Sequence, residues 1–328
     1  MRGLFASIFA PHSHDPADSI DAALQASSDG TRALKVSLAV LAATAVLQLV
    51  IAMLSGSVAL LADTVHNFGD ALTALPLGLA FWLGRRPANR RYTYGYGRSE
   101  DLAGIFIVVM IALSSGFAAW EAVRRLLHPH GVSKVGWVIV AGVIGAVGNE
   151  LVGAYRIRVG RRIGSAALVA DGMHARTDGL TSLAVVVGAI GAALGYQLAD
   201  PVVGLLITVV ILLVLKNAAR DVYRRLMDSV DPGLVEGVEV VLAKVAGVQA
   251  VEAVRIRWVG HELRAEAEIV SDADLSLADA HAIAEEARHQ LLHRVPRLTE
   301  ATIHTNPCTH DGRDHHASTE HHFPRRAH

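Results

Sequence analysis

Two stretches of the chain repeat one pattern: ALLADTVHNFGDALTAL (residues 59–75) and ALVADGMHARTDGLTSL (residues 167–183). They share the frame A-L-x-A-D-x-x-H-x-x-x-D-x-L-T-x-L and are identical at nine of seventeen positions. Both lie inside long apolar segments, where ionisable side chains are costly and normally face a polar cavity or one another. The duplication therefore indicates a functional site, because a single packing contact would not require the same polar residues twice.

The composition favours a membrane protein. The 328 residues are 52% hydrophobic and 19% charged, and the mean hydropathy is +0.37. Soluble globular domains average about 25% charged residues. The formal net charge of −1 gives no support for nucleic-acid binding. The one cysteine, Cys308, excludes an intramolecular disulfide and a cysteine-rich metal site.

Six apolar segments are long enough to cross a bilayer, which takes ~20 residues. They lie at approximately 33–54, 57–84, 102–123, 135–155, 165–195 and 198–216. We therefore predict an α-helical membrane protein with six transmembrane helices followed by a small soluble domain. The expected divisions are a cytoplasmic tail (1–30), the transmembrane domain (31–217), a cytoplasmic C-terminal domain (218–308) and a His-rich, disordered tail (309–328).

Basic residues predict the orientation in the membrane, because cytoplasmic loops carry an excess of Lys and Arg. Five arginines lie in the connection after the second segment (84–98). Two other connections are also basic, the fourth-to-fifth with Arg156, Arg158, Arg161 and Arg162 and the exit of the sixth with Lys216, Arg220, Arg224 and Arg225. Only the third-to-fourth connection, with two arginines and a lysine, opposes this pattern. We predict a multi-pass protein of the inner (cytoplasmic) membrane with both termini in the cytoplasm.

The predicted C-terminal domain has a readable order of elements. We expect a helix at 233–247, strands at 251–259 and 263–270, a helix at 276–295 and a short strand at 301–307. Gly247 is a typical helix stop, and Gly260 separates the two alternating stretches as a turn residue does. Ser276 and Asp279 fit a capping box at the start of the second helix. The order αββαβ predicts a small two-layer α+β domain.

Helical geometry places the repeated polar residues on one face of each segment. Residues three and seven positions apart lie close together around an α-helix. Asp63, His66 and Asp70 therefore share one face of the second segment. The residues of the fifth segment that share a face in the same way are Asp171, His174 and Asp178. We expect the two faces to meet.

If the two faces meet, they form a cluster of imidazoles and carboxylates, whose nitrogen and oxygen atoms are suited to binding a metal ion. The four best candidate ligands are the His-x-x-x-Asp pairs, because side chains four residues apart on a helix point into the same space. These are His66, Asp70, His174 and Asp178. Nitrogen and oxygen donors in a four-ligand set suit Zn²⁺. Asp63 and Asp171, one turn earlier, are expected to extend the ion path or to accept hydrogen bonds from the imidazoles.

The sequence resembles the cation diffusion facilitator transporters over approximately residues 30–308. The resemblance rests on the six segments, the two His-x-x-x-Asp pairs, the αββαβ order and four stretches of sequence. These are SGSVALLADTVHNFGD (55–70), YGYGR (94–98), SAALVADGMHARTDGLTS (165–182) and IHTNPC (303–308). The resemblance implies a homodimer that exchanges a divalent metal for protons, with a metallochaperone-like cytoplasmic domain. It also implies that His66, Asp70, His174 and Asp178 form the transport site and that zinc is the usual metal.

The resemblance further implies a regulatory metal site in the cytoplasmic domain, in altered form. His281 and His304 match the family pattern, whereas Asn306 stands where an aspartate is expected. Glu252 and Glu268 occupy places where other members carry histidine. Because carboxylates also bind metals, a weaker or altered site remains open, with a preference shifted toward harder ions.

These features together predict a divalent metal cation efflux transporter, and specifically a Zn²⁺/H⁺ antiporter. The expected partners are divalent metal ions, the lipid bilayer and a second copy of the chain, with no nucleic acid. Two alternatives stay open: Cd²⁺, Co²⁺, Ni²⁺ or Fe²⁺ as the main substrate, and a membrane metal sensor that does not transport. We predict that the protein is not an enzyme. An intramembrane metalloprotease needs the motif His-Glu-x-x-His, and after His261 and Glu262 the fifth position holds Ala265 where the second histidine is required.

Overall fold

The chain forms two compact units. The computed structural model describes residues 17–55, 74–127, 135–196, 199–309 and 318. The first unit, the helical unit, contains Leu24–Met227 together with Val259–His261. The second, the α/β unit, contains Met1–Ala23, Asp228–Trp258 and Glu262–His328.

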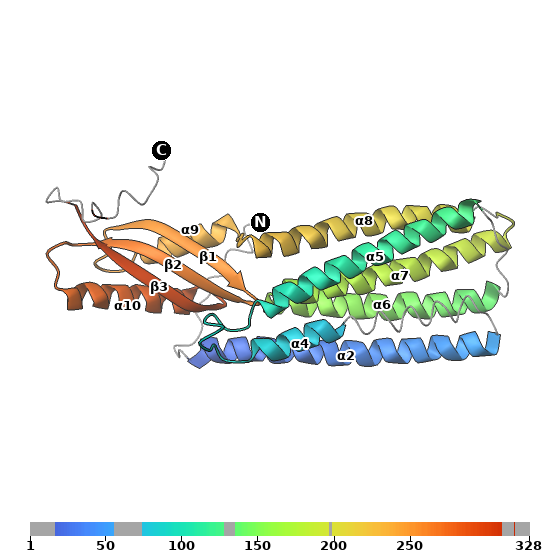
Figure 1. Cartoon of the computed structure of the whole chain (residues 1–328), viewed down its shortest axis with the longest axis horizontal. Coiled ribbons are helices and arrows are strands. Elements are labelled where there is room, and N and C mark those ends of the chain that lie inside the picture. Colours follow the sequence, from blue (N-terminus) through green and yellow to red (C-terminus); the bar gives the residue numbers. More distant parts are fainter. Residues whose placement is uncertain (1–16, 56–73, 128–134, 197–198, 310–317, 319–328) are drawn as a thin grey trace. The chain divides into compact units, whose positions relative to one another are not determined.

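Six helices in the described part of the chain belong wholly or largely to the helical unit. They are α2 (Ala17–Ser55), α4 (Ala74–Gly84), α5 (Ser99–Leu127), α6 (Val135–Ile163), α7 (Ala166–Ala193) and α8 (Ala199–Leu226). Figure 1 shows α5, α6, α7 and α8 side by side along a common axis, with α4 beside α2. α6 and α7 are joined by a tight turn in which Gly164 has a φ of +78°, a conformation that glycine adopts without strain. α6 and α7 therefore form an antiparallel helical hairpin.

Four of these helices are long and apolar enough to cross a membrane. The spans are Ser28–Leu54, Ser99–Arg124, Val135–Ile163 and Val202–Leu226. α7 has 28 residues but carries Asp171, Arg176 and Asp178 in its first half. The second predicted segment is described only from Ala74 onward, as the short apolar helix α4. The structure thus contains a membrane-type helical region, and the count of six transmembrane helices stays a prediction.

α6 and α8 continue beyond the ends expected from hydropathy. α6 reaches Ile163, whereas the apolar segment was expected to end near residue 155. α8 reaches Leu226, so the expected division after residue 217 falls within this helix. The extra turns are rich in Arg, which is a good helix former. Hydropathy therefore marks where the apolar run ends and not where the helix ends.

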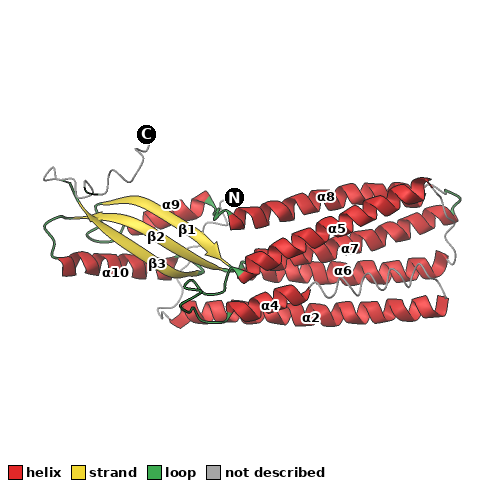
Figure 2. Ribbon diagram, in the orientation of Figure 1, coloured by secondary structure: helices red, strands yellow, loops and turns green. Residues whose placement is uncertain are grey.

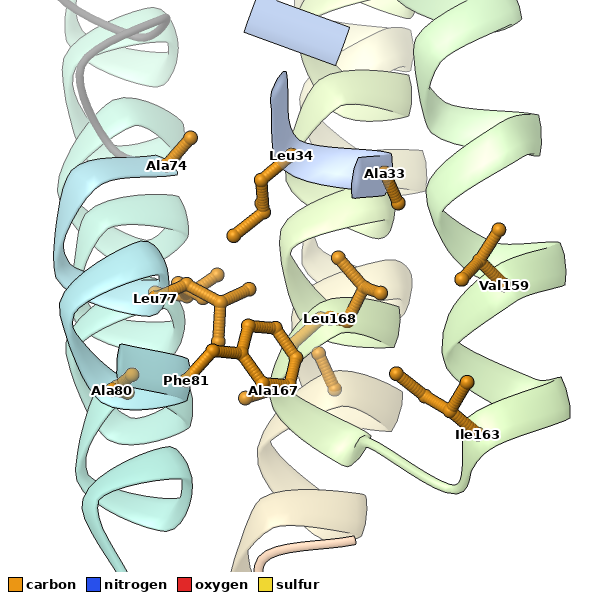
Figure 3. Packing of buried hydrophobic residues seen from close by; sticks show 14 of the residues in the cluster. Ala33, Leu34, Ala74, Leu77, Ala80, Phe81, Val159, Ile163, Ala167 and Leu168 are labelled. Carbon is orange, nitrogen blue, oxygen red and sulfur yellow. The ribbon is translucent and has the colours of Figure 1, made fainter. Parts of the chain in front are cut away.

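A buried apolar cluster holds the helical unit together (Figure 3). Its members come from all six helices and include Ala33 and Leu34 of α2, Leu77 and Phe81 of α4, Ile107 of α5, Ile163 of α6, Leu168 of α7 and Ile211 of α8. Phe81 is 1% exposed and lies over Gly30, where a Cβ atom would approach its Cζ to 2.7 Å. The absence of a side chain at Gly30 therefore allows α2 and α4 to pack closely.

The α/β unit has the predicted order αββαβ. Its elements are α9 (Pro232–Leu242), β1 (Ala250–Val259), β2 (Glu262–Ser271), α10 (Leu277–Arg294) and β3 (Leu298–Pro307). The three strands form one sheet in the order β1-β2-β3, with β2 and β3 parallel (Figure 2). The first helix ends at Leu242, five residues before Gly247, the stop that the sequence suggested. The small two-layer domain is confirmed.

Alternation along the strands gives the sheet one apolar and one charged face. Leu263, Ala265, Ala267 and Ile269 of β2 are buried and share a core with both helices, including Leu242 of α9 and Leu291 of α10. The opposite face carries ion pairs between β1 and β2, such as Arg257 with Glu266. Ser276 caps α10 as expected, since its Oγ accepts a hydrogen bond from Asp279 N. Asp231 caps α9, since its Oδ1 accepts a hydrogen bond from Gly233 N.

Candidate metal site

α7 turns three polar side chains toward the interior of the helical unit. Asp171 is 0% exposed and His174 is 1% exposed. The side chain of Asp178 is 9% exposed. The shared inward face that the spacing predicts for these three residues is therefore confirmed. The polar residues of the second copy, Asp63, His66 and Asp70, lie outside the described residues.

His174 and Asp178 form a pair of donors one helical turn apart. His174 Nδ1 lies 3.7 Å from Asp178 Oδ1. Two donors of a tetrahedral Zn²⁺ ion are about 3.4 Å apart, given bonds of about 2.0–2.2 Å. A shift of a few tenths of an ångström would therefore bring both atoms within bonding distance of one cation. The described residues contain no group of three or more His, Cys, Asp or Glu side chains that could hold a metal ion. The described part of the site is this pair.

Asp171 is paired with Arg156, a residue that hydropathy assigns to a loop. Arg156 Nη1 lies 2.9 Å from Asp171 Oδ2, and the two side chains are 2% and 0% exposed. Arg156 belongs to α6, whose described helix continues to Ile163. Its assignment to the fourth-to-fifth loop is therefore wrong. The missed signal was helical spacing, because Asn149, Arg156 and Ile163 are seven residues apart and all three are buried.

A second ion pair joins the same two helices. Arg176 Nε and Nη2 donate to Glu150 Oε2 and Oε1 at 2.9 and 2.6 Å, as a forked pair. The two side chains are 49% and 50% exposed. Arg176 therefore links α7 to α6 through Glu150. Asn149, the residue before Glu150 on α6, is buried.

Glycines let α6 and α7 approach closely. A Cβ atom at Gly172 would lie 2.8 Å from Ile157 Cγ1, 2.9 Å from Ile157 N and 3.0 Å from Arg156 Cβ. One at Gly153 would lie 2.4 Å from Arg176 Cγ. Such small residues allow helix backbones to pack tightly in membranes. The close approach brings Arg156 within reach of Asp171, the residue next to Gly172.

α2 packs against α6 through polar groups as well. Gln48 is 1% exposed, and its Nε2 donates a hydrogen bond to Ala141 O at 3.2 Å. A Cβ atom at Gly148 would lie 2.5 Å from Thr44 Oγ1. Gln48 therefore fixes α2 to the backbone of α6.

The α/β unit does not gather the residues of the predicted regulatory site into one cluster. Asn306 Nδ2 donates to Glu252 Oε2 at 2.6 Å. Glu268 Oε1 lies 3.7 Å from Arg255 Nη1, and Glu268 is the register neighbour of His304 on β3. His281 is exposed on α10. Both carboxylates thus have other partners, and metal binding by these residues stays a prediction.

The sequence matches two protein-family descriptions that together span almost all of the described chain. Residues 34–227 match "Cation efflux transmembrane domain". Residues 230–308 match "Cation efflux protein, cytoplasmic domain". The division between the matches agrees with the division between the helical and α/β units after Met227.

Similar full-length proteins come from bacteria and plants. The "Probable cation efflux system protein Rv2025c" of Mycobacterium tuberculosis (strain ATCC 25618 / H37Rv) is 60% identical over 310 residues, which are 94% of this chain and 93% of that protein. The "Magnetosome protein MamB" of Paramagnetospirillum magneticum is 24% identical and covers 79% of this chain and 88% of its own. The "Metal tolerance protein C1" of Arabidopsis thaliana is 27% identical and covers 78% of this chain and 58% of its own.

Among solved structures, a C-terminal domain of MamM in a nickel form is similar to part of the chain. It is 20% identical and covers 24% of this chain and 99% of its own, with a TM-score of 0.23.

Proposed function

The chain belongs to the cation efflux family of divalent metal transporters, and we propose that its principal cargo is Zn²⁺. The observation that carries the proposal is the buried pair of His174 and Asp178, whose donor atoms are 3.7 Å apart. The sequence repeats the same spacing at His66 and Asp70. Two imidazoles and two carboxylates suit Zn²⁺, and Cd²⁺, Co²⁺, Ni²⁺ or Fe²⁺ are the alternative cargoes.

Proton exchange follows from the chemistry of these ligands. A metal ion binds neutral imidazole and ionised carboxylate, so its arrival displaces protons from the site. Histidine is suited to this exchange because its protonation changes near neutral pH. The protein would take Zn²⁺ from the cytoplasm and release it outward as protons return to His66 and His174. Asp63, one turn before His66, would lie on the ion path.

The distribution of basic residues supports an inner-membrane protein with both termini in the cytoplasm. α6 and α8 finish at the same end of the helical unit, where α4 also ends (Figure 1). The basic residues at these ends are Arg85 and Arg86 after α4, Arg161 and Arg162 in α6, and Arg224 and Arg225 in α8. A cytoplasmic end with this many basic residues follows the positive-inside pattern.

A homodimer formed through the α/β unit accompanies this function. Residues 230–308 match the cytoplasmic domain of the family. The face of the sheet opposite α9 and α10 carries partly exposed ion pairs, including Arg255 with Glu268 and Arg257 with Glu266. A second copy could pair with such alternating charges through its own. Light scattering of the purified full chain should give the mass of a dimer.

Metal flux into inside-out proteoliposomes with an imposed pH gradient tests the proposed cargo and site. We expect Zn²⁺ uptake driven by the gradient, and its loss in His174→Ala and Asp178→Ala. His289→Ala is the matched control, because His289 is an exposed histidine on α10 and should leave uptake unchanged. Uptake led by another ion would correct the cargo. No uptake of any ion would favour the non-transporting sensor.

A further inference from the structure

Arg156 and Asp171 form an ion pair closed off from solvent within the helical unit. Their side chains are 2% and 0% exposed, with Nη1 and Oδ2 2.9 Å apart. Within the part of the chain that is described, Arg156 Nε and Nη2 and Asp171 Oδ1 have no hydrogen-bond partner. Among the described residues, each charge therefore has the other as its compensating partner, and removing one partner leaves a buried, unpaired charge.

Asp171 occupies a sensitive position. It lies three residues before His174 on the same buried face of α7. An ionised carboxylate at this place is a potential further ligand for a cation held by His174 and Asp178. The ion pair with α6 gives this carboxylate a different partner. Asp171 is thus close in sequence to the proposed site while its charge is neutralised by a neighbouring helix.

We propose that Arg156 is a positioning residue that keeps Asp171 out of the metal's ligand set and cancels its charge. This inference rests on the proposed function. With Asp171 held by Arg156, α7 presents His174 and Asp178 as its only ligands to the cargo. The arginine thereby sets how many negative charges face the divalent ion.

The number of carboxylates around the bound cation affects how readily the cation is released. A divalent cation is neutralised by two carboxylates, Asp70 and Asp178 in the proposed site. A third free carboxylate would make the ligand set negative and hold the cation more tightly, because charges interact strongly where water is excluded. Tighter binding slows release, and an efflux transporter must release its cargo in every cycle.

The close packing of α6 against α7 keeps Arg156 next to Asp171. Gly172 follows Asp171, and a Cβ atom there would be 2.9 Å from Ile157 N and 3.0 Å from Arg156 Cβ. The backbones of α6 and α7 are therefore in close contact beside the ion pair. This contact holds the backbone of Arg156 close to that of Asp171.

Arg156→Met tests the inference in the purified full chain. The substitution removes the charge and keeps a long apolar side chain, so Asp171 is freed. We expect the dissociation constant for Zn²⁺, measured by titration calorimetry, to fall by about tenfold or more. In proteoliposomes KM should fall together with kcat, because tight binding slows release. A protein with merely weakened packing would lose kcat without binding Zn²⁺ more tightly. Unchanged affinity would overturn the inference.

The double variant Arg156→Met/Asp171→Met supplies the rescue. An apolar pair can replace a buried ion pair at little cost in stability, so this variant should fold even where Arg156→Met alone does not. If Asp171 is no ligand, its Zn²⁺ dissociation constant and KM should lie within about threefold of the wild-type values. A tenfold or larger loss of affinity would place Asp171 among the ligands and overturn the inference.

The control is the other ion pair between α6 and α7. Glu150→Gln/Arg176→Gln removes a pair that is half exposed, and it should leave Zn²⁺ affinity within about threefold. His174→Ala distinguishes a failure of the proposed metal site from a failure of the role proposed for Arg156. If the wild type binds no Zn²⁺, or if His174→Ala binds it equally well, the proposed site fails and the inference falls with it. If both behave as expected and Arg156→Met does not, only the inference fails.

Discussion

Asn306 on β3 donates a hydrogen bond from Nδ2 to Glu252 Oε2 on β1, with a distance of 2.6 Å. β1 and β3 lie on either side of β2, so the two side chains meet across the central strand. Asn306 is 5% exposed. An amide at this place satisfies one oxygen of the carboxylate and adds no charge. Glu252 is therefore stabilised by a neutral donor where a cation could otherwise bind.

Asn306→Asp should create a divalent metal site in the α/β unit. Two carboxylates in place of a pair now 2.6 Å apart would repel each other, and a divalent cation between them would relieve the repulsion. In a His174→Ala background, calorimetry should detect a Zn²⁺ ion that the background protein does not bind. Asn306→Ala is the control, because it breaks the hydrogen bond without adding a carboxylate. Equal Zn²⁺ binding by both variants would contradict the prediction.

His174→Asp should change the preference of the transporter toward harder ions. The substitution replaces a nitrogen donor with an oxygen donor, and oxygen ligands suit Mn²⁺ better than imidazole does. We expect the ratio of Zn²⁺ to Mn²⁺ flux in proteoliposomes to fall by about tenfold or more. His289→Asp makes the same substitution on the exposed face of α10 and should leave the ratio unchanged. An unchanged ratio in His174→Asp would exclude His174 as a ligand.

The secondary structure of the α/β unit is predicted well from the sequence, because the patterns that indicate each strand and helix lie within a few neighbouring residues. Strand β2 alternates buried residues with less buried ones along its length, which is the pattern that predicted it. Ser276 and Asp279 are three residues apart and form the predicted cap without help from the rest of the fold. The hairpin turn and the parallel pairing of β2 with β3 then leave few alternatives for the topology.

The helical unit is predicted less completely because its decisive contacts are between helices. The inward face of α7 could be predicted, since it depends only on helical spacing. The partner of Asp171 could not, because hydropathy placed Arg156 in a basic loop together with Arg161 and Arg162. Arg156 is buried together with its partner, the Asp171 carboxylate on another helix. The pairing of Glu150 with Arg176 depends on the packing of α6 against α7 in the same way.

Gly172→Ala should destabilise the helical unit. The added Cβ would lie 2.9 Å from the backbone nitrogen of Ile157, which cannot move aside as a flexible side chain can. Overpacking of this kind costs about 1–3 kcal/mol. We expect a lower thermal unfolding midpoint in detergent. Gly116→Ala on α5 is the control, because no atom lies within 4 Å of the added Cβ, and its midpoint should equal or exceed that of the wild type.

Leu291→Ala should destabilise the α/β unit selectively. Leu291 is 0% exposed in the core between α10 and the sheet, so its truncation leaves a cavity that costs about 2–5 kcal/mol. Hydrogen exchange of the full chain measures this locally, and amides of β2 (262–271) should exchange about tenfold faster or more. Leu277→Ala removes the same atoms from a side chain that is 88% exposed on the same helix. Exchange in β2 should not change in this control, and equal acceleration by both variants would show that burial of Leu291 is not what stabilises the unit.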